Sequence, residues 1–103
     1  AARRGVSPLT KLSARYTPVC ARRIARLSPE INRLVRSNID SLLKMPTIGT
    51  ELTGDLEGYR SLRVRRYRII YRMNEAERYI EFNFVGHRRD VYETLRSLLA
   101  NRN

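Results

Sequence analysis

The chain has 103 residues, of which 42% are hydrophobic and 30% charged, and its 21 basic and 10 acidic residues give a net charge of +11. This length suits one modest core, and no apolar run approaches the roughly 18 residues that a membrane span needs. The first four residues, Ala1-Ala2-Arg3-Arg4, are followed by no apolar block of a secretory signal, so we expect a cytoplasmic protein. All basic residues except Lys11 and Lys44 are arginines, and such a chain favours a polyanionic partner.

Metal and redox chemistry find no support in the sequence. Cys20 is the only cysteine and His87 the only histidine, which argues against a disulfide or a multi-histidine metal site. No phosphate-binding loop or dinucleotide fingerprint is present. We therefore expect no cofactor, and we interpret Cys20 as a small, inert core residue.

The first half of the chain reads as a tail, a short strand and two helices. We expect a loose tail over 1–11 and one domain over 12–103, beginning with a weakly marked strand at 12–16. Thr17-Pro18 and Ser28-Pro29 each place a capping hydroxyl before a proline, which is typical of a helix start. The second helix carries an apolar stripe from Ile31 to Leu43 and ends at Met45-Pro46. The two helices follow each other almost directly and predict a helical hairpin.

The second half changes to a period of two. It predicts strands at 59–64, 67–73 and 78–85, whose short connections require antiparallel pairing. A last helix follows, with Asp90 and Glu93 placed as a capping box and an apolar stripe through Val91 and Leu95. The predicted fold class is α+β, a helical hairpin packed on a small antiparallel β-sheet with a C-terminal helix, in the order β-α-α-β-β-β-α.

Strand pairing predicts which side chains share the face of the sheet that the helices leave open. A symmetric turn at 65–66 places Arg63 directly opposite Arg68, and such like charges repel unless an anion lies between them. That open face would carry Tyr59, Ser61, Arg63, Arg68, Ile70 and Arg72. A symmetric turn at 74–77 adds Glu81, Asn83, Val85 and His87 to it and points Ile80, Phe82 and Phe84 to the core. Six arginines and no acidic residue lie between 59 and 73, so we interpret this face as a phosphate-binding surface.

Two segments of the chain form a recognisable pair of motifs. The first runs from Leu56 to Tyr71 and includes Tyr67-Arg68; the second runs from Val85 to Tyr92 and includes Gly86-His87-Arg88. Together they resemble the RelE family, the toxins of bacterial and archaeal toxin–antitoxin pairs. The resemblance covers about residues 12 to 100. It implies a type II toxin that cleaves mRNA in the ribosomal decoding site without a metal, by attack of the ribose 2′-OH on the adjacent phosphate. It also implies a RelB-like antitoxin, contact with mRNA and ribosomal RNA, operator DNA bound only by the toxin–antitoxin complex, and no membrane partner.

The resemblance also assigns roles to single residues. Arg68 would hold the scissile phosphate, with Arg63 at another basic position, and Arg88 would contact the leaving oxygen or the phosphate. Tyr92 would orient the 2′-OH or stack on a base. Further RNA contacts are expected from Ser61, Arg65, Arg66, Arg72 and Arg89.

The general base is left open by this pattern. Some RelE toxins have lysines where this chain has Tyr59 and Ser61, so the base is either His87 or a compensating group. Histidine titrates near pH ~6.5, which suits proton transfer. His87 is equally well interpreted as a hydrogen-bonding residue at a strand end, and Tyr92 as a partly buried aromatic of the last helix.

Two other functions compete with mRNA cleavage. The superfamily includes ParE-like toxins, which inhibit DNA gyrase by binding and without RNA chemistry. The chain could also be an RNA-binding or autoregulatory module without activity. The combination of Arg68, Arg88 and Tyr92 favours the RelE-type endoribonuclease, since ParE-like members generally lack it.

Overall fold

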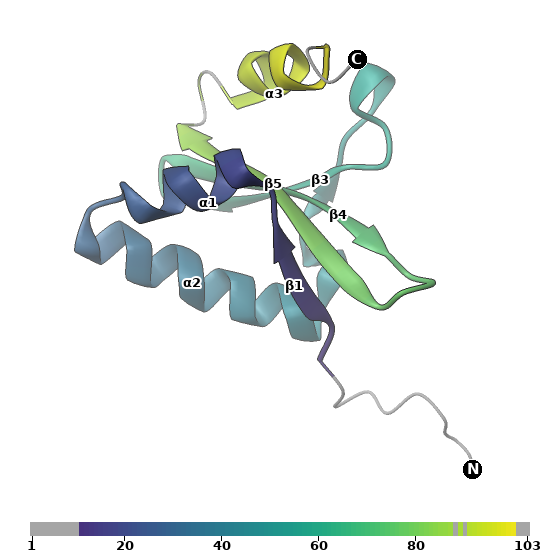
Figure 1. The fold of residues 1–103 in the computed structure, drawn as a ribbon, viewed down its shortest axis with the longest axis horizontal. Helices are drawn as coiled ribbons and strands as arrows, with labels where there is room; N and C mark the ends of the chain where they lie inside the picture. Colours follow the sequence, from purple (N-terminus) through teal and green to yellow (C-terminus); the bar gives the residue numbers. More distant parts are fainter. Residues whose placement is uncertain (1–10, 88, 90, 101–103) are drawn as a thin grey trace.

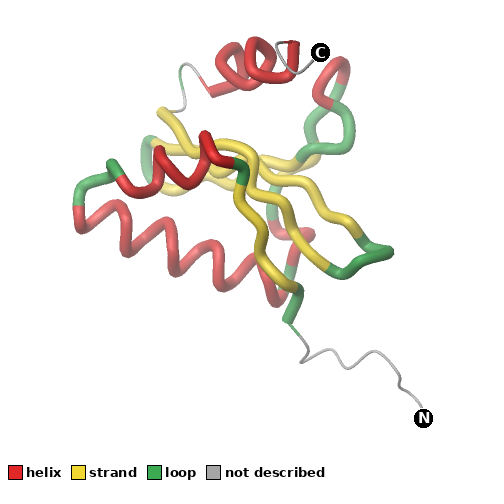
Figure 2. The backbone as a smooth tube through the Cα atoms, viewed as in Figure 1, coloured by secondary structure: helices red, strands yellow, loops and turns green. Residues whose placement is uncertain are grey.

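A five-stranded mixed sheet with helices on both of its faces forms the fold (Figures 1 and 2). The computed structural model describes residues 11–87, 89 and 91–100, so the expected tail, apart from Lys11, lies outside the described residues. The strand order is β1-β5-β4-β3-β2. The elements are β1 (Ser13–Tyr16), α1 (Pro18–Ala25), α2 (Pro29–Lys44), η1 (Pro46–Ile48), β2 (Thr50–Glu51), η2 (Gly54–Leu56), β3 (Arg60–Val64), β4 (Tyr67–Asn74), β5 (Tyr79–His87) and α3 (Val91–Ala100). This arrangement confirms the α+β class. None of the helices within the described residues is long and apolar enough to cross a membrane.

Both predicted helix starts are confirmed, although the predicted capping hydroxyl of Ser28 forms no capping hydrogen bond. Pro18 and Pro29 occupy the first turns of α1 and α2. The Thr17 hydroxyl accepts a hydrogen bond from the Cys20 amide at 3.2 Å and donates one to the Asn83 carbonyl at 3.0 Å. Thr17 therefore caps α1 and also ties the helix to β5, which explains why α1 lies along that strand.

The helical hairpin packs on one face of the sheet, on the opposite side from α3 (Figure 1). The hydrophobic core between the hairpin and the sheet includes Cys20 and Ile24 from α1 and Val35, Ile39 and Leu42 from α2. The sheet contributes Val64, Ile69, Tyr71, Ile80, Phe82 and Val85. Cys20 is fully buried, and burial raises the pKa of its thiol to about 12. Its interpretation as an inert core residue is confirmed.

The other face of the sheet, predicted to be open, is largely covered by α3. Val91 and Leu95 of α3 pack against Tyr59, Ile70 and Phe84, all of which are buried. These three side chains form a second small core on that face, because the apolar side of the amphipathic helix α3 packs against them. The basic surface is thus restricted to the parts of this face that α3 leaves free.

The first hairpin has the predicted register. Leu62 pairs with Ile69, and Arg63 lies directly opposite Arg68. Arg65 takes up the tight turn with a φ of 56°. A left-handed arginine costs on the order of 1–2 kcal/mol, so the flanking strand pairs hold a turn that the sequence itself does not favour.

The second hairpin departs from the predicted register. Its turn lies at 75–78, so that Asn74 pairs with Tyr79. The Asn74 side chain accepts a hydrogen bond from the Glu77 amide, three residues further on, at 2.9 Å, and the turn lies one residue later than predicted. Ile70 pairs with Phe84 but Tyr71 with Phe82, which leaves Asn83 as a bulge. The bulge swaps the faces of the residues that follow it, so the predicted placements of Phe84, Val85 and His87 are wrong.

Two strands complete the sheet at its edges. β1 pairs with β5 in parallel, over Ser13–Tyr79 to Tyr16–Phe82, so the sheet is mixed and not purely antiparallel. β2 pairs with β3 through Thr50 and Glu51. A strand of two residues has no detectable pattern, and it was not predicted.

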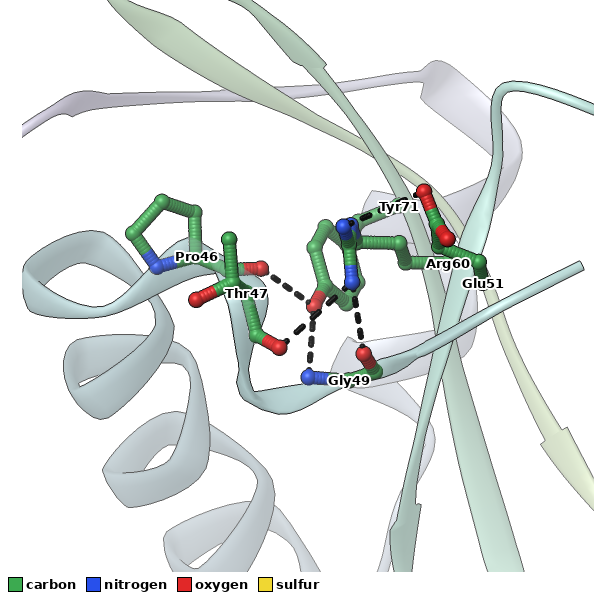
Figure 3. Close-up of polar contacts among 6 residues, drawn as sticks. All are labelled: Pro46, Thr47, Gly49, Glu51, Arg60 and Tyr71. Carbon is green, nitrogen blue, oxygen red and sulfur yellow. Dashed lines mark hydrogen bonds and ion pairs between the residues drawn. The ribbon is translucent and has the colours of Figure 1, made fainter.

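A buried tyrosine fastens the loop after α2 to the sheet (Figure 3). The Tyr71 hydroxyl donates to the Pro46 carbonyl at 2.7 Å and accepts from the Gly49 amide at 3.0 Å. A Cβ at position 49 would overlap this hydroxyl, so only glycine fits there. Arg60 of β3 donates to the Gly49 carbonyl at 2.8 Å and forms an ion pair with Glu51 at 3.4 Å. These contacts hold the segment from Pro46 to Glu51 against the edge of the sheet.

Candidate functional site

Three side chains from three elements meet beside the α3-covered face, and we call them the Arg68 site. Arg68 of β4 donates to the Ser61 hydroxyl oxygen of β3 at 3.3 Å, and the Tyr92 hydroxyl of α3 donates to the same oxygen at 3.2 Å. The Arg68 guanidinium lies 5.8 Å from the centre of the Tyr92 ring. Ser61 is 2% exposed, whereas Arg68 and Tyr92 are half-buried. The buried serine therefore holds an arginine and a tyrosine in fixed positions at the protein surface.

The charge of this site is not compensated within the described part of the chain. Arg63 lies directly across from Arg68, and its guanidinium Nε donates to the carbonyl of Arg65 at 3.2 Å. No carboxylate of a described residue forms an ion pair with either arginine. Two adjacent cations without an acid create a surface on which an anion relieves their repulsion.

The turn arginines extend the positive surface. Arg65 and Arg66 are exposed, and Arg65 forms only a long ion pair of 3.7 Å with Glu30. Arg89 is also exposed. Arg88 lies outside the described residues.

Arg72 is not brought to the Arg68 site. It follows Arg68 by four residues on β4, a separation of roughly 13 Å along a strand. Its guanidinium pairs with Glu81 at 3.4 Å and lies 5.1 Å from the centre of the Tyr59 ring. Arg72 is thus held by a carboxylate and an aromatic ring of the protein itself.

His87 lies on the other face of the sheet. It pairs with Tyr67, the two rings are 5.9 Å apart in an edge-to-face arrangement, and Arg68 pairs with Gly86. The prediction that His87 shares the face of Arg68 is wrong, because the Asn83 bulge reverses the alternation after Phe82. His87 is instead exposed beside α1, where Arg22, Arg23 and Arg26 gather. These three arginines were not predicted to belong to any site, although Arg22-Arg23 and Arg26 stand without an acidic residue between them.

Comparison with protein families identifies one match. The model described as the ParE toxin of the type II toxin–antitoxin system parDE matches residues 15–92. This range contains Ser61, Arg68 and Tyr92. Comparison with curated protein sequences gave no match.

Solved structures of similar fold include toxins from three bacteria. The toxin–antitoxin complex RelBE2 from Mycobacterium tuberculosis has 28% identity and a TM-score of 0.70, over 76% of this chain and 92% of that chain. A mutant of the Escherichia coli toxin RelE in the free state has 13% identity and a TM-score of 0.73, over 90% and 98% of the two chains. A YoeB/ParE toxin from Agrobacterium tumefaciens has 19% identity and a TM-score of 0.67, over 74% and 98%.

Proposed function

Because the chain belongs to the RelE/ParE superfamily of type II toxin–antitoxin toxins, we propose that it is a ribosome-dependent endoribonuclease that cleaves mRNA and stops translation. The observation that carries this proposal is the Arg68 site. It presents a guanidinium fixed by a buried serine, next to a tyrosine hydroxyl and a second arginine. Such a group is suited to a phosphodiester and to the extra charge that it gains during cleavage.

The reaction requires three events at one phosphate. The ribose 2′-OH loses its proton and attacks phosphorus, a phosphorane with additional negative charge forms, and the 5′-oxygen leaves with a proton. We assign stabilisation of the phosphorane to Arg68, supported by Arg63 from the opposing strand. Charge stabilisation by fixed donors is usually the largest catalytic contribution.

Tyr92 is assigned to the orientation of the ribose. Its hydroxyl is held by Ser61 and its ring lies beside Arg68, so a nucleotide bound to the arginine would contact it. The resemblance to RelE toxins adds Arg88 at the leaving oxygen. Since His87 faces α1, we do not assign it the role of general base at this phosphate.

The proposal includes a cognate antitoxin. The similar RelBE2 structure is a toxin–antitoxin complex. Among the described residues no carboxylate pairs with Arg63 or Arg68, which favours an antitoxin that supplies carboxylates. In the cytoplasm, where we place this toxin, such a complex would also bind its operator DNA. Co-expression with the neighbouring gene should yield a stable complex, and recovery of harmless free toxin at full yield would contradict this part.

Arg68→Ala tests the activity. Removing one preorganised charge from a transition state costs about 2.7–4 kcal/mol, or roughly a hundredfold to a thousandfold in rate. We expect this loss in single-turnover cleavage of mRNA on programmed ribosomes, with an unchanged circular dichroism spectrum. Arg33→Ala, an exposed arginine of α2, removes the same charge elsewhere and should cleave normally. Full activity of Arg68→Ala would refute the endoribonuclease.

A second candidate is inhibition of DNA gyrase by binding. Two observations favour it: the matching family model is that of the ParE toxin, and the positions that carry lysine in some RelE toxins are here the buried Tyr59 and Ser61. A supercoiling assay with purified gyrase separates the two functions. Loss of supercoiling activity without any mRNA cleavage would select this candidate.

A further inference from the structure

A groove beside α1, where this helix packs against β5, has the composition of an anion site. It has a volume of about 510 Å³ and lies between α1 and the ends of β4 and β5. We call it the α1 groove, and its polar and aromatic lining consists of Arg22, Arg23, Arg26, Tyr67 and His87. Val19, Leu27, Val85 and Gly86 complete the lining, and none of the described residues that line the groove is acidic.

The three arginines of the α1 groove are not neutralised by the described part of the chain. All three are exposed, and none forms an ion pair with a carboxylate of a described residue. Arginines spaced over little more than one helical turn repel one another. A bound phosphate would relieve that repulsion, as we propose for Arg63 and Arg68.

Arg23 is held in a fixed orientation within this groove. Its guanidinium stacks over the ring of Phe84, 4.3 Å from the centroid, and Phe84 is only 2% exposed. The ring in turn depends on Gly86, where a Cβ would come within 2.5 Å of Phe84 Cε2. A stacked guanidinium uses its flat face for the ring and keeps its N–H edge for a ligand. Bidentate contact with a phosphate uses that edge.

The aromatic pair gives the groove a second recognition element. Tyr67 and His87 lie edge to face on paired positions of β4 and β5, and unpaired bases stack on such rings. Tyr67 also adjoins both Arg66 of the turn and Arg68 of β4. An RNA strand bound at the Arg68 site would reach the α1 groove over the turn at 65–66, whose two arginines are exposed.

We propose that the α1 groove binds the phosphates and a base of single-stranded RNA at a distance from the phosphate that is cut. This inference rests on the proposed function, because it extends the path of the same RNA across the β3–β4 turn. Cations and aromatic rings together favour a nucleic acid strand over an acidic peptide, which would use only the charges.

The test measures binding of a short fluorescent oligoribonucleotide that carries 2′-O-methyl groups and so cannot be cleaved. R22Q/R26Q removes two groove charges and leaves the stacked Arg23 in place. The slope of log Kd against log salt concentration should fall by roughly 0.7 for each lost phosphate contact, or about 1.4 in total. R33Q/R36Q on the exposed face of α2 removes the same charge and should keep the wild-type slope.

His87 provides an independent signal, because it is the only histidine of the chain. Its imidazole resonances should shift when the oligoribonucleotide is added, and less so in R22Q/R26Q. Equal salt slopes for the two double variants, or a His87 shift produced by polyglutamate and not by RNA, would overturn the inference. Cleavage by Arg68→Ala is measured separately on ribosomes. Its persistence would refute the endoribonuclease and leave the binding result to decide the groove on its own.

Discussion

Tyr71→Phe removes a hydroxyl that joins two elements without changing the packing of the ring. The hydroxyl makes two hydrogen bonds, to the Pro46 carbonyl at 2.7 Å and from the Gly49 amide at 3.0 Å. Each such bond contributes about 1 kcal/mol, and a buried donor left without a partner costs about 1–3 kcal/mol. Since Gly49 is buried, we expect a loss of roughly 2–3 kcal/mol in the free energy of unfolding.

Urea unfolding followed by circular dichroism measures this loss. With a denaturant slope of about 1–3 kcal/mol per molar urea, the midpoint should fall by roughly 0.7–3 M while the slope stays constant. Tyr16→Phe is the matched control, because Tyr16 is 43% exposed and its ring stacking on Phe82 is retained. That control should change stability by less than about 0.5 kcal/mol. Equal small effects of the two substitutions would refute the idea that the Tyr71 hydroxyl fastens this loop.

Three further perturbations test the cap, the buried thiol and the candidate site. Thr17→Ala should cost about 1–2 kcal/mol in urea unfolding, because it removes the cap of α1 and the bond to the Asn83 carbonyl; an unchanged midpoint would contradict this. Burial raises the pKa of Cys20 from 9.0 to about 12, so only the unfolded thiol ionises just above pH 9. The free energy of unfolding should fall with a slope that approaches about 1.4 kcal/mol per pH unit between about pH 10 and 12, and Cys20→Ala should remove that contribution. Tyr92→Phe should slow mRNA cleavage by about a hundredfold if its hydroxyl, held by Ser61, orients the ribose. A normal cleavage rate would show that the hydroxyl has no such role and that Tyr92 acts only by stacking on a base.

The two hairpins show how far the sequence determines strand pairing. Two residues between the strands at 60–64 and 67–74 leave one register, so the opposition of Arg63 and Arg68 was predictable. The second turn depends on one side-chain hydrogen bond from the Glu77 amide to Asn74. That shift of the turn moves the pairing by two residues and preserves the faces, which is why Ile80 and Phe82 were placed correctly.

The bulge at Asn83 was not predictable from local pattern. It arises where β4 changes from pairing with Phe82 to pairing with Phe84, and it lets Phe84 fill the core under α3 while Val85 joins the core under the helical hairpin. A single inserted residue reverses every later side chain. The error in the placement of His87 therefore has the same cause as the error for Phe84 and Val85.

The candidate site was partly predictable for a different reason. The resemblance to RelE toxins brought Arg68 and Tyr92 together, but it did not show that Ser61 would be a buried acceptor for both. The α1 groove combines residues from α1 with the ends of two distant strands. The sequence pattern could not show that its arginines lie near His87, because that proximity depends on the Thr17 cap and on the bulge at Asn83.

The parallel pairing of β1 with β5 delays folding during synthesis. Ser13 to Tyr16 emerge from the ribosome early, yet their partners are Tyr79 to Phe82, and such non-local pairs form slowly. Until β5 emerges, β4 lacks a neighbour on one side, and Tyr92 follows later still. A nascent chain therefore carries its arginines without an assembled Arg68 site. The Arg68 site therefore cannot form until the segment through Tyr92 has left the ribosome.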